Sequence, residues 1–140
     1  MDVDYDKGAE LAKFIASRKL CAAYAEIMDQ DKFRIYSKKA DLIVNCSPVG
    51  MHPHVELSPV DDLSRVAPEA VLCDVIYNPL LTKFLHMAQA RGVRTVNGLS
   101  MFVYQGILTL EIMLGIKPPA GFMKEVVRLQ LEKWAGIHSS

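Results

Sequence analysis

The sequence predicts an α/β fold with a parallel sheet. Two continuous apolar runs, 42–46 and 71–77, are each followed by a turn signal, Ser47–Pro48 and Asn78–Pro79. Continuous rather than alternating hydrophobicity is typical of parallel strands that are covered on both faces. A helical pattern separates the second run from a third, shorter run at 93–96, and alternating strands and helices indicate a parallel sheet.

Length and composition restrict the class of protein. With 140 residues, 51% of them hydrophobic and 23% charged, the chain fits one globular domain. Its 16 Lys and Arg balance 16 Asp and Glu without forming a basic stripe, so we expect no nucleic-acid partner. The acidic stretch 1–6 lacks the apolar core of a signal peptide, and the apolar run 99–116 contains Gln105 and Glu111. We therefore expect neither secretion nor a membrane span.

The cysteines indicate a reducing compartment. There are three of them, without CxxC spacing, which predicts neither a disulfide framework nor a zinc site. All three lie in apolar stretches, where a free cysteine behaves as a small buried hydrophobic residue. We expect a cytoplasmic protein with buried thiols at Cys21, Cys46 and Cys73.

The first part of the chain predicts one helix. Apolar residues recur at helical spacing within 7–18, and Asp6 is available to cap this helix. These apolar residues are Leu11, Phe14 and Ile15. The stretch 21–39 is ambiguous, and we expect only a short strand at 22–24 within it.

The second part predicts three helices. The first has Thr82 as its cap and Gly92 as its left-handed terminator. Its inward residues are Phe84, Leu85 and Ala88. A nearly all-apolar helix at 99–114, which we expect to be buried, ends at Gly115, and an amphipathic helix follows at about 122–134.

This order of elements matches the second half of a Rossmann-like sheet with closing C-terminal helices. A complete dinucleotide-binding domain has six strands in two halves, with a Gly-rich turn in the first half. The eight glycines of this chain form neither GxGxxG nor GxxxxGK[ST]. We therefore expect residues 1–140 to be the C-terminal portion of such a domain, with about 1–97 as the Rossmann-like half and 98–140 as closing helices.

Ligands of open parallel sheets bind at the carboxyl ends of the strands. That rule selects 45–50, 77–79 and 97–98. Gly98 either lets the backbone approach a flat ring or is an ordinary turn glycine. Gln105, inside the apolar helix, either bonds to protein backbone or binds a polyhydroxylated ligand. Tyr77 can pack its ring while its hydroxyl seeks a partner.

Other polar residues are weaker candidates. His52 and His54 look like a metal-binding pair but lack a further ligand at suitable spacing, so a solvated loop is favoured and no metal is expected. Cys46 and Ser47 have no His or acid in a recognisable triad arrangement. Asp74, inside an apolar strand, is expected either to cap a neighbouring loop or to hold the Asn-Pro turn.

Three motifs at these strand ends resemble those of the shikimate dehydrogenase family. The stretch DLIVNCSPVGM at 41–51 is similar to ADLxxNxTPxGM of the family, CDVIYNPLLT at 73–82 to DxxYxPxxT, and VNGLSMFVYQ at 96–105 to GLxM(L/F)xxQ. The motifs have the family's order and spacing, and the resemblance covers about residues 4–120, the C-terminal half of a family member. Ser47 and Ser100 stand where Thr and Gly are common in the family.

The resemblance implies reversible hydride transfer between a nicotinamide dinucleotide and 3-dehydroshikimate or shikimate, in aromatic amino-acid biosynthesis. It places Tyr77 and Gln105 against the substrate, Val75 and Gly98 at the nicotinamide, and Ser47 and Met101 beside it. The family's proton-transferring Lys and Asp belong to a substrate domain without a counterpart here, so no catalytic residue is assigned to this chain. We expect the isolated chain to be inactive.

The resemblance leaves the cofactor open between NADP and NAD. Members that use NADP have Asn-Arg-Thr where this chain has Asp2-Val3-Asp4. In a complete dinucleotide-binding domain, an acid such as Asp2 at the end of the domain's second strand favours the free ribose hydroxyl of NAD. The alternatives to this function are a non-enzymatic association module and a quinate-preferring dehydrogenase. Since a half-sheet exposes an edge and an apolar face, we also expect a homo-oligomer.

Overall fold

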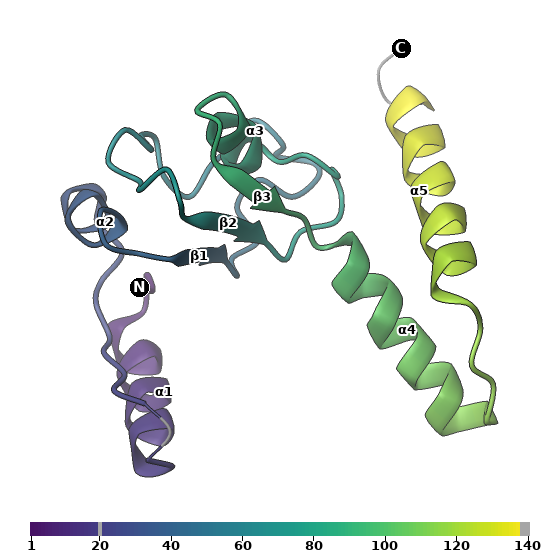
Figure 1. Ribbon diagram of the computed structural model, residues 1–140, viewed down its shortest axis with the longest axis horizontal. Helices are drawn as coiled ribbons and strands as arrows, with labels where there is room; N and C mark the ends of the chain where they lie inside the picture. Colours follow the sequence, from purple (N-terminus) through teal and green to yellow (C-terminus); the bar gives the residue numbers. More distant parts are fainter. Residues whose placement is uncertain (20, 138–140) are drawn as a thin grey trace.

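The three strands form one parallel sheet in the order β1-β2-β3, so the predicted α/β class is confirmed (Figure 1). The computed structural model describes residues 1–19 and 21–137. The elements of that part are α1 (Tyr5–Ser17), α2 (Gln30–Ser37), β1 (Leu42–Asn45), β2 (Val71–Asp74), α3 (Lys83–Gln89), β3 (Arg94–Val96), α4 (Leu99–Leu114) and α5 (Ala120–Ile137). Figure 1 shows α1 and α2 at one side of the sheet and the hairpin of α4 and α5 at the other.

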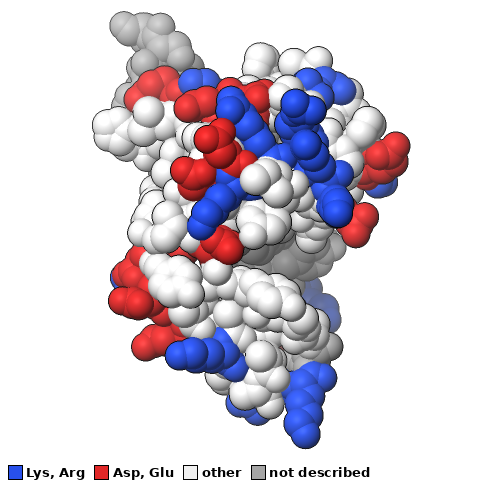
Figure 2. Space-filling model, turned by 90° about the vertical axis from the view of Figure 1, so that its left-hand side faces the viewer, with Lys and Arg blue, Asp and Glu red and all other residues white. Residues whose placement is uncertain are grey.

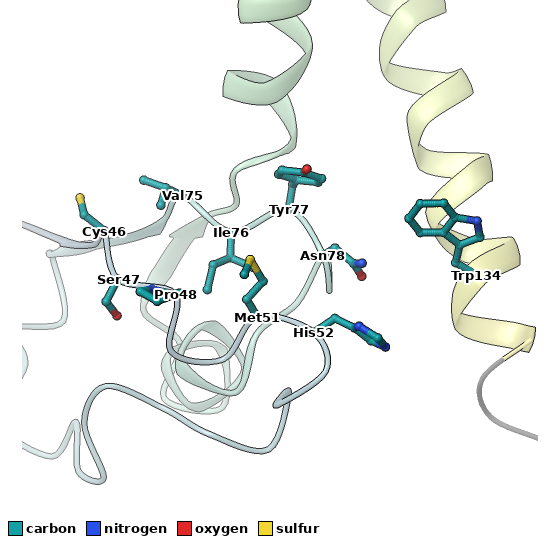
Figure 3. Close-up of a pocket in the computed structure, with 10 residues that line it drawn as sticks. All are labelled: Cys46, Ser47, Pro48, Met51, His52, Val75, Ile76, Tyr77, Asn78 and Trp134. Atoms are coloured by element: carbon teal, nitrogen blue, oxygen red, sulfur yellow. The ribbon is translucent and has the colours of Figure 1, made fainter.

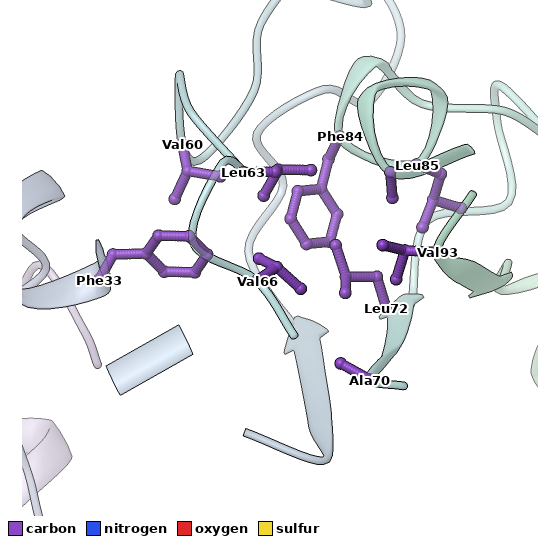
Figure 4. Close-up of a cluster of buried hydrophobic side chains, with 10 residues drawn as sticks. Phe33, Val60, Leu63, Val66, Ala70, Leu72, Phe84, Leu85 and Val93 are labelled. Carbon is purple, nitrogen blue, oxygen red and sulfur yellow. The ribbon is translucent and has the colours of Figure 1, made fainter. Parts of the chain in front are cut away.

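The main core lies between the sheet and α3. Leu72, at the centre of β2, is completely buried and packs in a cluster with residues of α3 and of the loop before β2 (Figure 4). The predicted inward residues of α3 are confirmed as buried, namely Phe84, Leu85 and Ala88. The Thr82 cap is confirmed as well, since its hydroxyl accepts a hydrogen bond from the backbone N–H of Leu85 at 3.3 Å. Gly92 has a φ of 73°, as its predicted left-handed role requires.

α4 has the predicted bounds but is not a buried helix. It ends at Gly115, whose φ of 67° gives the left-handed cap. Only Leu99, Val103 and Ile107 are buried, on the stripe that packs against α5. The opposite stripe is exposed, and the side chain of Ile112 is 83% exposed. The prediction of burial was wrong because hydrophobicity on both sides of a helix does not say which side finds a partner.

The N-terminal region differs from the prediction in three respects. Asp4, not Asp6, caps α1, and it accepts a hydrogen bond from the backbone N–H of Lys7 at 3.2 Å. No strand forms at 22–24; the chain there instead leads to an isolated parallel bridge between Asp2 and Ile27. The short helix α2, which was not predicted, is capped by Asp29. Figure 2, viewed from this side, shows mixed acidic and basic side chains above a largely uncharged surface.

Two expectations about burial were also wrong. β1 is not covered on both faces, since Leu42 and Val44 are exposed. The thiols are not all buried, because Cys21 and Cys46 are exposed and only Cys73 is partly covered. Within the described residues, no helix is both long and apolar enough to cross a membrane.

Candidate functional site

A cavity of about 410 Å³ opens where β1 and β2 end, at the edge of the sheet that the strand rule selects (Figure 3). This size is within the range of small-molecule sites. Its wall combines apolar side chains with a hydroxyl, an amide, an imidazole and an indole. The lining residues are Cys46, Ser47, Pro48, Met51, His52, Val75, Ile76, Tyr77, Asn78 and Trp134.

Asp74 organises the floor beneath this cavity. Its carboxylate is completely buried and accepts hydrogen bonds from the Thr82 hydroxyl at 2.8 Å and from the backbone N–H of Ile76 at 3.0 Å. The Asn45 amide donates to the same carboxylate at 3.3 Å. Asp74 therefore binds the end of β1, the segment just after β2 and the cap of α3, and its bonds do not reach the Asn-Pro turn itself.

Asn45 extends this network into the turn after β1. Its side-chain oxygen accepts hydrogen bonds from the Ser47 hydroxyl at 2.7 Å and from the Ser47 backbone N–H at 3.1 Å. This is the arrangement by which an Asn side chain fixes the backbone two residues on. The sheet register pairs Asn45 with Asp74, so the ends of both strands are joined through side chains as well as through backbone. Ser47 consequently has a fixed position at the cavity wall.

Gly98 is required by contact with protein backbone. Its N–H donates to the Ile76 carbonyl at 3.0 Å, and a Cβ at this position would lie 2.0 Å from the carbonyl oxygen of Val75. Its φ is −73°, so no left-handed turn is needed here. The close approach at Gly98 is thus to the backbone of the segment after β2, and its predicted approach to a flat ring stays a prediction.

Tyr77 is anchored by its ring. The ring stacks on Phe102 of α4, with centroids 4.0 Å apart and planes inclined by 20°. The side chain is half-buried and also lines the cavity. Tyr77 thus connects the end of β2 to the first turn of α4, and one face of its ring is already occupied.

The structure brings together three of the seven predicted site residues, Ser47, Val75 and Tyr77, in the cavity wall. Gly98 adjoins them through its backbone contacts but does not line the cavity. Met101 and Gln105 lie on the exposed side of α4, so the expectation that Gln105 is a buried amide was wrong. Only the stripe of α4 that packs against α5 is buried, and the side of the helix that carries Met101 and Gln105 is exposed to solvent.

Asp2 lies in a different part of the molecule. It is exposed, and its backbone exchanges hydrogen bonds with residues 26 and 28, at 3.0 Å and 2.8 Å. This pairing is an isolated parallel bridge outside the named strands, and the predicted role of Asp2 at the cofactor stays a prediction. A second cavity, of about 480 Å³, adjoins this contact and is lined by Met1, Tyr24, Glu26 and Tyr36.

Comparison with known proteins agrees with the three motifs. Residues 98–128 match the family model described as the shikimate 5'-dehydrogenase C-terminal domain. The chain is 51% identical over 133 residues to a shikimate dehydrogenase (NADP(+)) of Syntrophomonas wolfei, a match that covers 95% of this chain and 46% of that protein. The chain matches the C-terminal part of proteins of the shikimate dehydrogenase family. It spans just under half the length of this curated relative.

Solved structures show that the fold is shared with the family. A shikimate 5-dehydrogenase from Listeria monocytogenes, in complex with shikimate and NAD, has a TM-score of 0.79 and 27% identity, covering 88% of this chain and 43% of that one. A quinate dehydrogenase from Corynebacterium glutamicum in complex with NAD has a TM-score of 0.75 and 27% identity, with coverages of 89% and 43%. The Rossmann-like character of the sheet is therefore confirmed.

Sequence patterns did not predict the roles of several residues that shape the cavity. The sequence placed Asn45 only in the run 42–46 and the strand-end segment 45–50, and Thr82 only as a helix cap, although both also donate hydrogen bonds to the buried carboxylate of Asp74. The Asn-Cys-Ser-Pro signal after the first strand could have indicated that Asn45 fixes the turn. No local pattern pointed to Trp134, which reaches the cavity from α5.

Among the described residues, no group of three or more His, Cys, Asp or Glu side chains could hold a metal ion. His52 and His54 are both exposed, and the His54 imidazole lies 3.7 Å from the Glu56 carboxylate. This arrangement is that of a surface loop.

Cys73 is expected to be alkylated more slowly than Cys21 at neutral pH. Burial raises the pKa of the Cys73 thiol above its usual value, and the adjacent Asp74 carboxylate adds to this effect. Because the thiolate is the reactive form, a raised pKa lowers the reactive fraction until the pH rises. Iodoacetamide labelling followed by peptide mass spectrometry measures both sites, with the denatured chain as the control. Equal rates in the folded chain would contradict the expectation.

Proposed function

We propose that this chain forms the part of an NAD(P)-dependent shikimate dehydrogenase that holds the nicotinamide and one side of the substrate. The observation that carries the proposal is the cavity at the carboxyl ends of β1 and β2, which contains Ser47, Val75 and Tyr77 together. The relative from Syntrophomonas wolfei and the Listeria monocytogenes structure support this activity by their names.

The cavity suits a nicotinamide ring. Met51, Val75 and Ile76 give it an apolar wall for a flat ring, while the Ser47 hydroxyl and the Asn78 amide offer polar partners for a carboxamide. When bound, the cofactor supplies or accepts the hydride. The residues of this chain bind and orient, and we assign no proton transfer to them.

Tyr77 and Gln105 are the residues of this chain that bind the substrate. The stacked Tyr77 ring is fixed against Phe102, so its hydroxyl is held in a defined place without further ordering. The Gln105 side chain is exposed on α4 and is open to a ligand. A hydroxylated acid offers both groups suitable hydrogen-bond partners.

Asp2 supports NAD over NADP. Its carboxylate is exposed at the strand contact, where it can accept a hydrogen bond from a free ribose hydroxyl and would repel a phosphate. The relative's name carries NADP(+), so both cofactors belong in the test. We also propose a cytoplasmic location, in keeping with the three free thiols.

The test is a chimera in which this chain replaces the matched 133 residues of the Syntrophomonas wolfei relative. We expect reduction of 3-dehydroshikimate that exceeds reduction of 3-dehydroquinate, the ketone that corresponds to quinate, and a larger kcat/KM with NADH than with NADPH. A preference for 3-dehydroquinate would instead favour the quinate dehydrogenase, which the Corynebacterium glutamicum structure makes a specific alternative. No turnover with either substrate would overturn the proposal.

Replacing Gln105 with leucine in this chimera is expected to raise the KM for shikimate about tenfold, since one hydrogen bond to a charged or polar ligand is lost. Because Gln105 is exposed, the free energy of unfolding should change by less than about 0.5 kcal/mol. Gln130→Leu, at an exposed position of α5, is the matched control and should leave the KM unchanged. An unchanged KM in Gln105→Leu would remove this residue from the substrate site.

We further propose that the chain self-associates through the exposed stripe of α4. Tyr104, Leu108 and Ile112 recur at helical spacing on this stripe and are all exposed. An apolar surface of this kind is typical of an association site. β1 is a second candidate, as its outer edge has no partner strand in the described sheet.

Sedimentation velocity is expected to show a dimer or a larger species of the 140-residue chain. Leu108→Glu with Ile112→Glu should weaken association at least about tenfold, because two charges would have to be desolvated at the interface. Gln130→Glu on α5 is the control. A monodisperse monomer of the unchanged chain would contradict the proposal, and an oligomer that persists in the double variant would point to the β1 edge.

A further inference from the structure

Trp134 is a cavity residue that neither the motifs nor the proposed function uses. It is the only tryptophan in the chain, and it lines the cavity opposite His52, in the segment after β1, and Asn78, in the segment after β2 (Figure 3). Its side chain is 51% exposed, although indole is the largest side chain in proteins. Such a ring at a cavity rim has a face that is open to a ligand.

The packing of α5 explains how a residue near the end of this helix reaches the strand ends. Met123, Val127 and Leu131 form the stripe of α5 that packs against α4. Trp134 lies one turn beyond Leu131 on the same stripe. Figure 1 shows that α5 runs back along α4 toward the sheet, so the continuation of this stripe passes the start of α4 and faces the segment after β2.

The composition of the cavity indicates which ligand the indole meets. The cavity wall includes the apolar side chains of Val75 and Ile76, and none of the described lining residues is acidic. A positively charged ring would therefore find no carboxylate in this wall. Among aromatic side chains, indole gives the strongest attraction to a cation over its face. Tyr77 is less suited to this role, since one face of its ring is covered by Phe102.

We propose that Trp134 forms the outer wall of the nicotinamide pocket and favours the oxidised, positively charged ring over the reduced, neutral one. This inference rests on the proposed function, because it takes the cavity to be the nicotinamide site. It assigns to α5 a direct part in cofactor binding. Trp134 acts as a specificity-determining residue for the redox state of the cofactor.

The experiment measures binding of NAD⁺ and NADH to the 140-residue chain by calorimetry, for the unchanged chain, Trp134→Phe and Trp134→Ala. We expect Trp134→Ala to weaken NAD⁺ binding about two- to fivefold and NADH binding by less, with Trp134→Phe in between. Phe122→Ala is the matched control, because Phe122 is an exposed aromatic of α5 outside the cavity lining. The single indole gives a second readout, since NAD⁺ should quench its fluorescence saturably.

The outcomes separate this inference from the proposed function. NAD⁺ could bind the chain without quenching the indole fluorescence and bind Trp134→Ala as tightly as the unchanged chain. In that case Trp134 does not form the outer wall of the nicotinamide pocket, while the proposed function stands. If Trp134→Ala weakens both cofactors equally, the preference for the oxidised ring is overturned. If neither cofactor binds the unchanged chain, this inference fails, while turnover of the chimera still decides the proposed function.

Discussion

Gly98→Ala is expected to lower the free energy of unfolding by about 3 kcal/mol, the upper part of the range for overpacked sites. The added Cβ would lie 2.0 Å from the Val75 carbonyl oxygen and 2.8 Å from that of Ile76. Both neighbours are backbone atoms, so no side chain can rotate away to make room. The segment after β2 would have to move, and the hydrogen bond from the Gly98 N–H to Ile76 would be lost with it.

Urea unfolding followed by circular dichroism measures this effect, and Gly106→Ala is the matched control. Gly106 belongs to α4, like the residue after Gly98, and a Cβ there meets no heavy atom within 4 Å. Since alanine is the better helix former, Gly106→Ala should raise the free energy of unfolding by up to about 1 kcal/mol. A loss below about 0.5 kcal/mol in Gly98→Ala would show that the segment after β2 yields easily.

Asp74→Ala is expected to cost about 3–5 kcal/mol of stability, because it leaves buried hydrogen-bond donors without an acceptor. The carboxylate accepts from the Thr82 hydroxyl, the Ile76 N–H and the Asn45 amide. Asp74→Asn keeps the shape of the side chain but brings an amide NH₂ toward these donors, and it should cost about 1–3 kcal/mol. Asp41→Ala, an exposed acid just before β1, is the control and should change stability by less than about 0.5 kcal/mol.

A double-mutant cycle tests whether Asp74 acts through its partners. Thr82→Val removes the hydroxyl that donates to Asp74 at 2.8 Å and also removes the cap of α3. Because the two side chains share one hydrogen bond, Asp74→Ala with Thr82→Val should cost less than the sum of the single changes, by about 1 kcal/mol or more. Strict additivity would contradict the network, as would a stable Asp74→Ala variant.

The sequence by itself determined the sheet class and the elements around it. Continuous apolar runs predicted β1 and β2, and Thr82 and Gly115 marked helix boundaries that the structure confirms. These signals are local, because propensity, capping and left-handed glycines act within a few residues. The three motifs also selected the strand ends where the cavity lies, and so the parts of the site that belong to β1 and β2.

Only the tertiary structure determined which side of each helix packs against another element and which side is exposed. The apolar side of α4 that carries Leu108 and Ile112 is exposed, and Gln105 lies on that exposed side, because burial depends on a partner element that no local pattern specifies. The role of Asp74 likewise arises from donors on three separate segments. Trp134 reaches the cavity because α5 folds back along α4, and such long-range contacts leave no periodic signal in the sequence.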